Sequence, residues 1–129
     1  MVRLMLTGLV VGLFNDPTRL KILSVTSKEP KSARDIANMF HIPLGRCYRK
    51  IKKLEEDGLL AVVDREPTED GKKQNVYLSQ LKMVSITYEI GRLTIKAVIN
   101  GQAPLEFIEE LDQYLYPEEN PAYEGYVLN

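Results

Sequence analysis

The sequence predicts an α+β domain, because helical and strand-like patterns occupy different parts of the 129-residue chain. Apolar residues recur every three or four positions in the first half, which is the period of an amphipathic helix. They alternate with other residues over 84–90 and 93–99, on either side of Gly91, which is the period of a half-buried strand. A chain of this length with 44% apolar residues can bury one core. We therefore expect one compact helical part followed by strands.

Composition excludes several classes of protein. Cys47 is the one cysteine and His41 the one histidine, so an internal disulfide and a structural zinc site are not expected, and we predict no metal and no cofactor. The longest apolar stretch, 4–14, is too short for a bilayer, which needs ~20 residues. No signal-peptide cleavage site follows it, because the next residues are Asn15-Asp16-Pro17. We expect a cytoplasmic protein.

Four helices are expected in the first half of the chain. The first covers 4–14, and the second covers 17–27, with Asp16 as N-cap and Pro17 at the first helical position. A third helix covers 33–40, behind a capping box in which Asp35 replaces the usual Glu. The turn at His41-Ile42-Pro43 ends it, and a fourth helix follows over 44–57, where Gly58 stops it. Its buried side is Cys47, Ile51 and Leu54.

Strand patterns follow these helices. Residues 59–66 and 74–79 flank turn residues and predict a hairpin with a long tip, and 28–31 reads as a loop. A second hairpin is expected around Gly91. Pro104 is predicted to open a final amphipathic helix, whose apolar side is Leu105, Ile108, Leu111 and Leu115. We divide the chain into a domain over 1–80, a hairpin and helix extension over 81–116, and an acidic mobile tail over 117–129.

The order of two short helices, a turn and a hairpin is that of a winged helix-turn-helix. Residues 15–23 resemble the opening helix of ArsR-type repressors, 32–37 resemble their first motif helix, and 47–60 resemble their recognition helix leading into the wing. The resemblance covers 15–79 and implies a homodimeric transcriptional regulator that binds double-stranded DNA. The chain lacks the paired cysteines and the His and acid clusters of ArsR-type metal sensors, so metal sensing is not implied.

Charge is distributed unevenly along the chain. Residues 31–53 hold seven bases and one acid, whereas 101–129 hold seven acids and no base. A basic block of this kind points to nucleic acid, although two ordinary solvated faces would give the same count. In a winged helix the recognition helix enters the major groove. Arg49 is the best candidate for reading guanine, because its guanidinium can bridge two acceptors on that base.

The candidate DNA-binding residues fall into three groups. Near the start of the fourth helix, Leu44, Gly45, Tyr48 and Arg49 are expected to face outward. Arg46, Lys50, Lys52 and Lys53 are expected to contact phosphates, which give affinity rather than sequence information. The remaining candidates are Lys31, Arg34, and the hairpin residues Arg65, Lys72 and Lys73. Acids surround the hairpin cations, so contact there is an open question.

Dimerisation is expected because a single winged helix makes few base contacts, and specific affinity of ~10⁻⁸ M or better usually needs two half-sites. The apolar first helix supplies candidate interface residues, namely Leu6, Leu9, Val10 and Leu13. The alternative is a winged-helix module that binds another protein and does not contact DNA. No phosphate loop, nucleophile motif or metal-ligand spacing indicates an enzyme. The operator and any small-molecule effector are not readable from the sequence.

Overall fold

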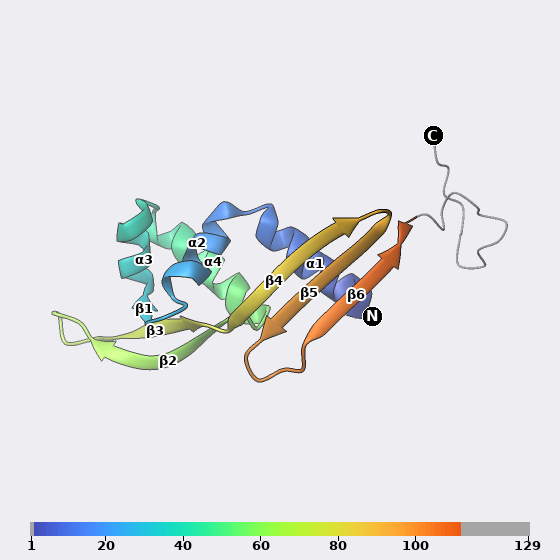
Figure 1. The fold of residues 1–129 in the computed structure, drawn as a ribbon. Helices are drawn as coiled ribbons and strands as arrows, with labels where there is room; N and C mark the ends of the chain where they lie inside the picture. Colours follow the sequence, from blue (N-terminus) through green and yellow to red (C-terminus); the bar gives the residue numbers. More distant parts are fainter. Residues whose placement is uncertain (1, 112–129) are drawn as a thin grey trace.

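The computed structural model describes residues 2–111, with side chains from Thr7 onward. Within that range the fold is α+β, with four helices and two three-stranded antiparallel sheets (Figure 1). The helices are α1 (Val2–Phe14), α2 (Pro17–Val25), α3 (Ala33–Phe40) and α4 (Leu44–Glu56). The strands are β1 (Lys31–Ser32), β2 (Leu60–Pro67), β3 (Lys73–Ser79), β4 (Leu81–Glu89), β5 (Arg92–Ile99) and β6 (Leu105–Glu110). None of the helices in this range is long and apolar enough to cross a membrane.

The helix boundaries confirm the predicted capping residues. Asp16 Oδ1 accepts hydrogen bonds from the backbone N–H groups of Thr18 and Arg19, at 3.1 and 3.4 Å, and so caps α2. Ser32 and Asp35 form the capping box of α3, with each side chain accepting from the other residue's backbone N–H. Such caps stabilise a helix by about 1 kcal/mol each, because they satisfy N–H groups that have no partner within the helix.

The inner face of α4 packs into a cluster of buried side chains from the helices, which we call the helix core. Cys47, Ile51 and Leu54 are 0 to 1% exposed, as their spacing predicted. They pack with Ile22 of α2 and Ile36 of α3 in one cluster. Burial raises the pKa of the Cys47 thiol, and the thiol donates a hydrogen bond to the Ala33 carbonyl oxygen. The opposite face of α4 is thereby fixed toward solvent.

The first sheet has the strand order β1-β3-β2, and its β2–β3 hairpin projects past α3 as a wing (Figure 1). This hairpin confirms the predicted pair of strands. The loop expected over 28–31 is shorter than predicted, because Lys31 and Ser32 pair with Tyr77 and Val76 of β3. This short strand joins the start of α3 to the wing.

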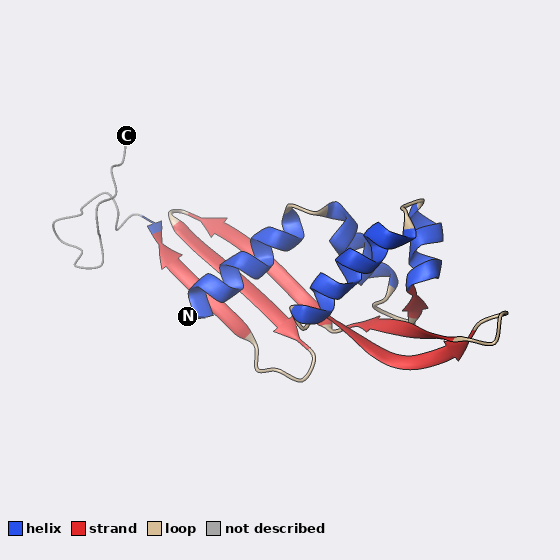
Figure 2. Ribbon diagram, turned by 180° about the vertical axis from the view of Figure 1, so that it is seen from behind, coloured by secondary structure: helices blue, strands red, loops and turns tan. Residues whose placement is uncertain are grey.

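The second sheet, β4-β5-β6, is covered on one face by α1 (Figure 2). Val10 of α1 packs against Ile95 and Ala97 of β5, and all three are at most 4% exposed. The other face carries ion pairs, Lys96–Glu106 at 3.5 Å and Arg92–Glu110 at 2.6 Å. The predicted second hairpin is present as β4 and β5.

The helix predicted after Pro104 is wrong, because residues 105–110 form strand β6. Leu105 lies opposite Ala97 and Phe107 lies opposite Ile95, so both side chains join the cluster under α1. Strand pairing also satisfies the backbone groups along the edge of β5, which a helix would have left unpaired. Leu115 and the predicted acidic tail over 117–129 lie outside the described residues.

The interface predicted on α1 also needs correction. Val10 and Leu13 are 0 and 1% exposed within a single chain, so neither side chain has surface left for a second copy. Leu9 is half-buried and packs against both core clusters. The side chain of Leu6 lies outside the described part of the chain. The apolar residues of α1 are numerous because this helix packs against both the helix core and the second sheet.

Candidate nucleic-acid interface

Helix α4 lies between α2 on one flank and the wing on the other. Its exposed surface starts with Gly45, Arg46, Tyr48 and Arg49 near the N-terminus and continues with Lys52 and Lys53. Leu44, which we predicted to face outward, instead packs against the helix core. From Gly45 to Lys53, α4 therefore exposes cationic side chains together with the half-exposed ring of Tyr48, and Glu55 and Glu56 add exposed acids at its C-terminal end.

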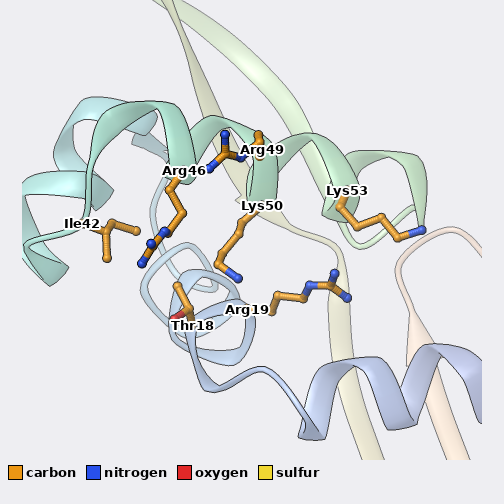
Figure 3. A pocket seen from close by; sticks show the side chains of 7 residues that line it. All are labelled: Thr18, Arg19, Ile42, Arg46, Arg49, Lys50 and Lys53. Carbon is orange, nitrogen blue, oxygen red and sulfur yellow. The ribbon is translucent and has the colours of Figure 1, made fainter.

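The flank of α4 that faces α2 is hollowed into a cleft of about 430 Å³, which we call the cationic cleft. Figure 3 shows Arg46 and Lys50 extending from α4 toward Thr18 and Arg19 on α2. The lining residues are Thr18, Arg19, Ile42, Arg46, Arg49, Lys50 and Lys53. Five of these seven side chains are cationic, so the cleft concentrates positive charge in one concave place.

Asp16 holds two of these cations. Lys50 Nζ donates to Asp16 Oδ2 at 2.6 Å, and Arg19 Nε lies 3.3 Å from the same oxygen. Arg19 Nε is buried and has no hydrogen-bond partner among the described residues. Burial alone would raise the pKa of the Asp16 carboxyl, but the Lys50 hydrogen bond and charge, with the backbone N–H groups of α2, lower that pKa overall. Lys50, predicted as a free phosphate contact, is thus tied to α2 in this structure.

The wing flank of α4 has a different charge pattern. A second cleft of about 580 Å³, the wing cleft, runs between α3, α4 and the hairpin tip. Its charged residues are Arg34, Lys72 and Lys73 together with Glu69 and Asp70. The Thr68 hydroxyl donates to Asp70, and this hydrogen bond and the Lys72 N–H lower the pKa of the Asp70 carboxyl. The wing cleft therefore places acidic side chains next to its cations.

The other predicted site residues lie outside these two clefts. Lys31 Nζ is 2.5 Å from Glu29, and this hydrogen bond raises the pKa of the lysine. Arg65 is exposed on β2 and lines neither cleft. Lys52 lies on the wing side of α4 beside Glu55 and Glu56. The sequence predicted the cations of α4 but missed Arg19, because its approach to α4 depends on how α2 packs.

Comparison with protein families assigns this part of the chain. Residues 14–63 match the family model of a helix-turn-helix domain. The chain contains a helix-turn-helix. Helices α3 and α4 are its two helices, and the β2–β3 hairpin adds the wing. In helix-turn-helix domains the second helix carries the base-reading residues. No curated protein matches the chain.

Proposed function

We propose that this protein is a sequence-specific transcriptional regulator that binds double-stranded DNA as a homodimer in the cytoplasm. The observation that carries the proposal is the exposed face of α4. The helix turns Cys47, Ile51 and Leu54 into the core and leaves Arg46 and Arg49 exposed toward solvent. A recognition helix needs this division, because its inner face must hold it rigidly while its outer face enters the major groove.

Roles on this face follow from position. Tyr48 and Arg49 lie at the N-terminal end of the exposed face, where a recognition helix meets base edges, so we assign base reading to them. Arg46, Lys52 and Lys53 flank that position and are assigned to phosphates. Arg34 follows the first residue of α3 and is also exposed, which suits a phosphate contact from the first motif helix.

The dimer surface is reassigned to apolar side chains that remain exposed. On α1 these are Val11 and Phe14, at 46 and 51% exposure. On β4 they are Ile86 and Tyr88, at 46 and 68%. Ile86 lies opposite Ile95 and Tyr88 opposite Leu93, so both side chains project from the sheet face that α1 covers. A second copy that covered this surface would remove four large apolar side chains from water in each chain.

The experiment that tests the proposed function is selection from a pool of randomised duplex DNA by the purified full chain. We expect enrichment of a two-fold symmetric motif whose half-sites are about one helical turn apart. Arg49→Ala should relax the preference at one base pair of each half-site, whereas Lys28→Ala, in the loop after α2, should leave the motif unchanged. A pool that shows no enrichment would contradict sequence-specific binding and favour a protein-interaction module.

The dimer is tested separately by analytical ultracentrifugation. We expect the wild type to sediment as a dimer at tens of micromolar, and Tyr88→Asp to sediment as a folded monomer. Leu13→Asp should instead unfold the chain, because Leu13 is 1% exposed in the helix core. A monomeric wild type would contradict the dimer and the two half-sites, while leaving DNA binding by one copy to be measured directly.

A further inference from the structure

The cationic cleft carries more positive charge than its position on α4 explains. Five cationic side chains from two helices line it. Asp16 pairs with Lys50 and Arg19 and Asp57 pairs with Lys53, which leaves Arg46 and Arg49 without an ion pair among the described residues. Cations that merely solubilise a helix spread over its surface, because like charges at close range repel one another. Arg46 and Lys50 instead extend from α4 into the same cleft, toward α2 (Figure 3). Their convergence indicates a bound anion with several acceptor oxygens.

We propose that the cationic cleft is a binding site for a phosphoryl group. Arg46 and Lys50 approach it from α4, and Thr18 lies across from them on α2, so an anion between the helices would meet polar side chains on two sides (Figure 3). A guanidinium presents paired N–H donors that match phosphate oxygens, and a lysine adds a mobile point charge. Arg19 Nε is buried and lies 3.3 Å from Asp16 Oδ2, so it would have to leave that carboxylate to reach such a ligand.

Asp16 is the internal competitor for this site. Its Oδ1 caps α2, whereas its Oδ2 binds Lys50 and lies near Arg19. A phosphoryl group entering the cleft takes over the role of Oδ2, and Lys50 and Arg19 turn from the carboxylate to the ligand. The cap is made by the other oxygen and remains in place. One oxygen of the Asp16 carboxylate therefore caps α2, and the other competes with the phosphoryl group for the cations.

Two sources could supply this phosphoryl group. One is the backbone of duplex DNA at the edge of the half-site, and this source rests on the proposed function. The other is a free polyphosphate ligand, which would then compete with DNA for Arg46 and Arg49. Inorganic tripolyphosphate, titrated without DNA, tests the site itself and does not depend on whether the protein binds DNA.

Asp16→Asn is the decisive variant. Asparagine is as good an N-cap as aspartate, so α2 stays capped, but the group that replaces Oδ2 no longer attracts cations. We expect tripolyphosphate to bind this variant about three- to tenfold more tightly than the wild type in calorimetric titration. Glu29→Gln is the matched control. It also removes one negative charge and breaks one ion pair, with Lys31, but it lies outside the cleft, so we expect a change below about twofold.

Loss of a cleft cation should act in the opposite direction. Arg46→Gln should weaken tripolyphosphate binding about tenfold, because a charge-assisted hydrogen bond is removed. Lys28→Gln, in the loop after α2 and outside the cleft, should change it by less than about twofold. Circular dichroism of each variant checks that the fold is intact. Equal effects of Asp16→Asn and Glu29→Gln, or of Arg46→Gln and Lys28→Gln, would overturn the site.

A second arm identifies the source of the phosphoryl group. Binding of tripolyphosphate at micromolar concentration assigns the site to a free polyphosphate. Binding only at millimolar concentration, with Asp16→Asn also tightening binding to a random-sequence duplex, assigns it to the DNA backbone. Tripolyphosphate binding in the cleft without any duplex binding would support the site and contradict the proposed function. Failure of Asp16→Asn to tighten either ligand would overturn the site.

Discussion

The two flanks of α4 differ in the number of cations they carry relative to the acids beside them. On the α2 flank, five cationic side chains line the cleft, and three of them pair with acids: Lys50 and Arg19 with Asp16, and Lys53 with Asp57. On the wing flank, three cations share a cleft with Glu69 and Asp70. Phosphate responds to the local balance of charge and not to the cations alone. The difference predicts that the DNA backbone is held chiefly on the α2 side of the recognition helix.

This asymmetry bears on whether the wing contacts DNA, which the sequence left open. The wing tip is a stable turn, in which the Thr68 N–H donates to the Lys72 carbonyl oxygen at 2.6 Å and Asp70 accepts from the Lys72 N–H at 3.3 Å. Its acids are part of that turn. Asp70 takes part in the hydrogen bonds of this turn, so the folded wing places negative charge where a DNA phosphate would otherwise lie.

The largest expected effect is a charge reversal on the α2 flank. Arg46→Glu should weaken binding to a random duplex by about 2–3 kcal/mol, because it removes a phosphate contact and adds a repulsive charge. Lys72→Glu makes the same change on the wing flank and should cost less than about 0.7 kcal/mol. Fluorescence anisotropy at 100 mM salt measures both. Equal losses for the two variants would remove the asymmetry.

The next effect concerns Arg49, to which we assign base reading. Arg49→Ala should weaken binding to a selected site by ~1–3 kcal/mol and leave random duplex nearly unaffected, as expected for a base contact. The comparison of specific with non-specific affinity distinguishes this role from a phosphate contact. If Arg49→Ala weakened both duplexes to the same degree, Arg49 would belong with the phosphate contacts of the α2 flank.

A smaller effect tests whether acids limit the wing. Glu69→Gln removes one negative charge from the wing cleft without touching the hydrogen bonds of Asp70. We expect it to tighten random-duplex binding by about 0.5 kcal/mol at 50 mM salt, and the gain should disappear at 300 mM because exposed charges are screened. Unchanged affinity at low salt would show that DNA does not approach the wing tip.

The smallest effect is on stability. The pKa of Asp16 is lowered from its ordinary value of 3.8, so its ion pairs stabilise the fold above that value and are lost as the pH falls through the lower folded-state pKa. Asp16→Asn keeps the cap and should cost less than about 1 kcal/mol at pH 7. Urea unfolding between pH 2 and 7 should show the difference between wild type and variant shrinking below pH 4. A constant difference would mean that Asp16 acts through something other than its charge.

Local signals in the sequence were enough to predict the helices of the winged helix-turn-helix. The cap at Asp16, the capping box at Ser32 and the apolar stripe through Cys47 each depend on neighbours within one or two turns. Strand β6 was mistaken for a helix because Leu105, Ile108 and Leu111 fit a helical spacing, while Phe107 marks the strand period. Only the open edge of β5 decides between the two patterns, and that edge is a tertiary feature.

The candidate site divides in the same way. The cations of α4 are visible as a run of residues on one helix, so the sequence predicted them. The ion pair of Lys50 with Asp16 joins residues 34 positions apart and depends on the packing of α2 against α4. Two of the four interface residues predicted on α1, Val10 and Leu13, are buried within the chain for a related reason. Val10 and Leu13 looked like surplus apolar surface because the second sheet that covers Val10 comes about 80 residues later in the chain.

The most direct test of the account is the salt dependence of binding between the full chain and a 20-base-pair duplex. If α4 and its α2 flank neutralise about five phosphates per copy, the logarithm of the binding constant should fall linearly with the logarithm of salt concentration, with a slope of about −4 or steeper. Arg46→Gln should flatten that slope by about one unit. No detectable binding at 50 mM salt, or a slope near zero, would contradict DNA binding through α4.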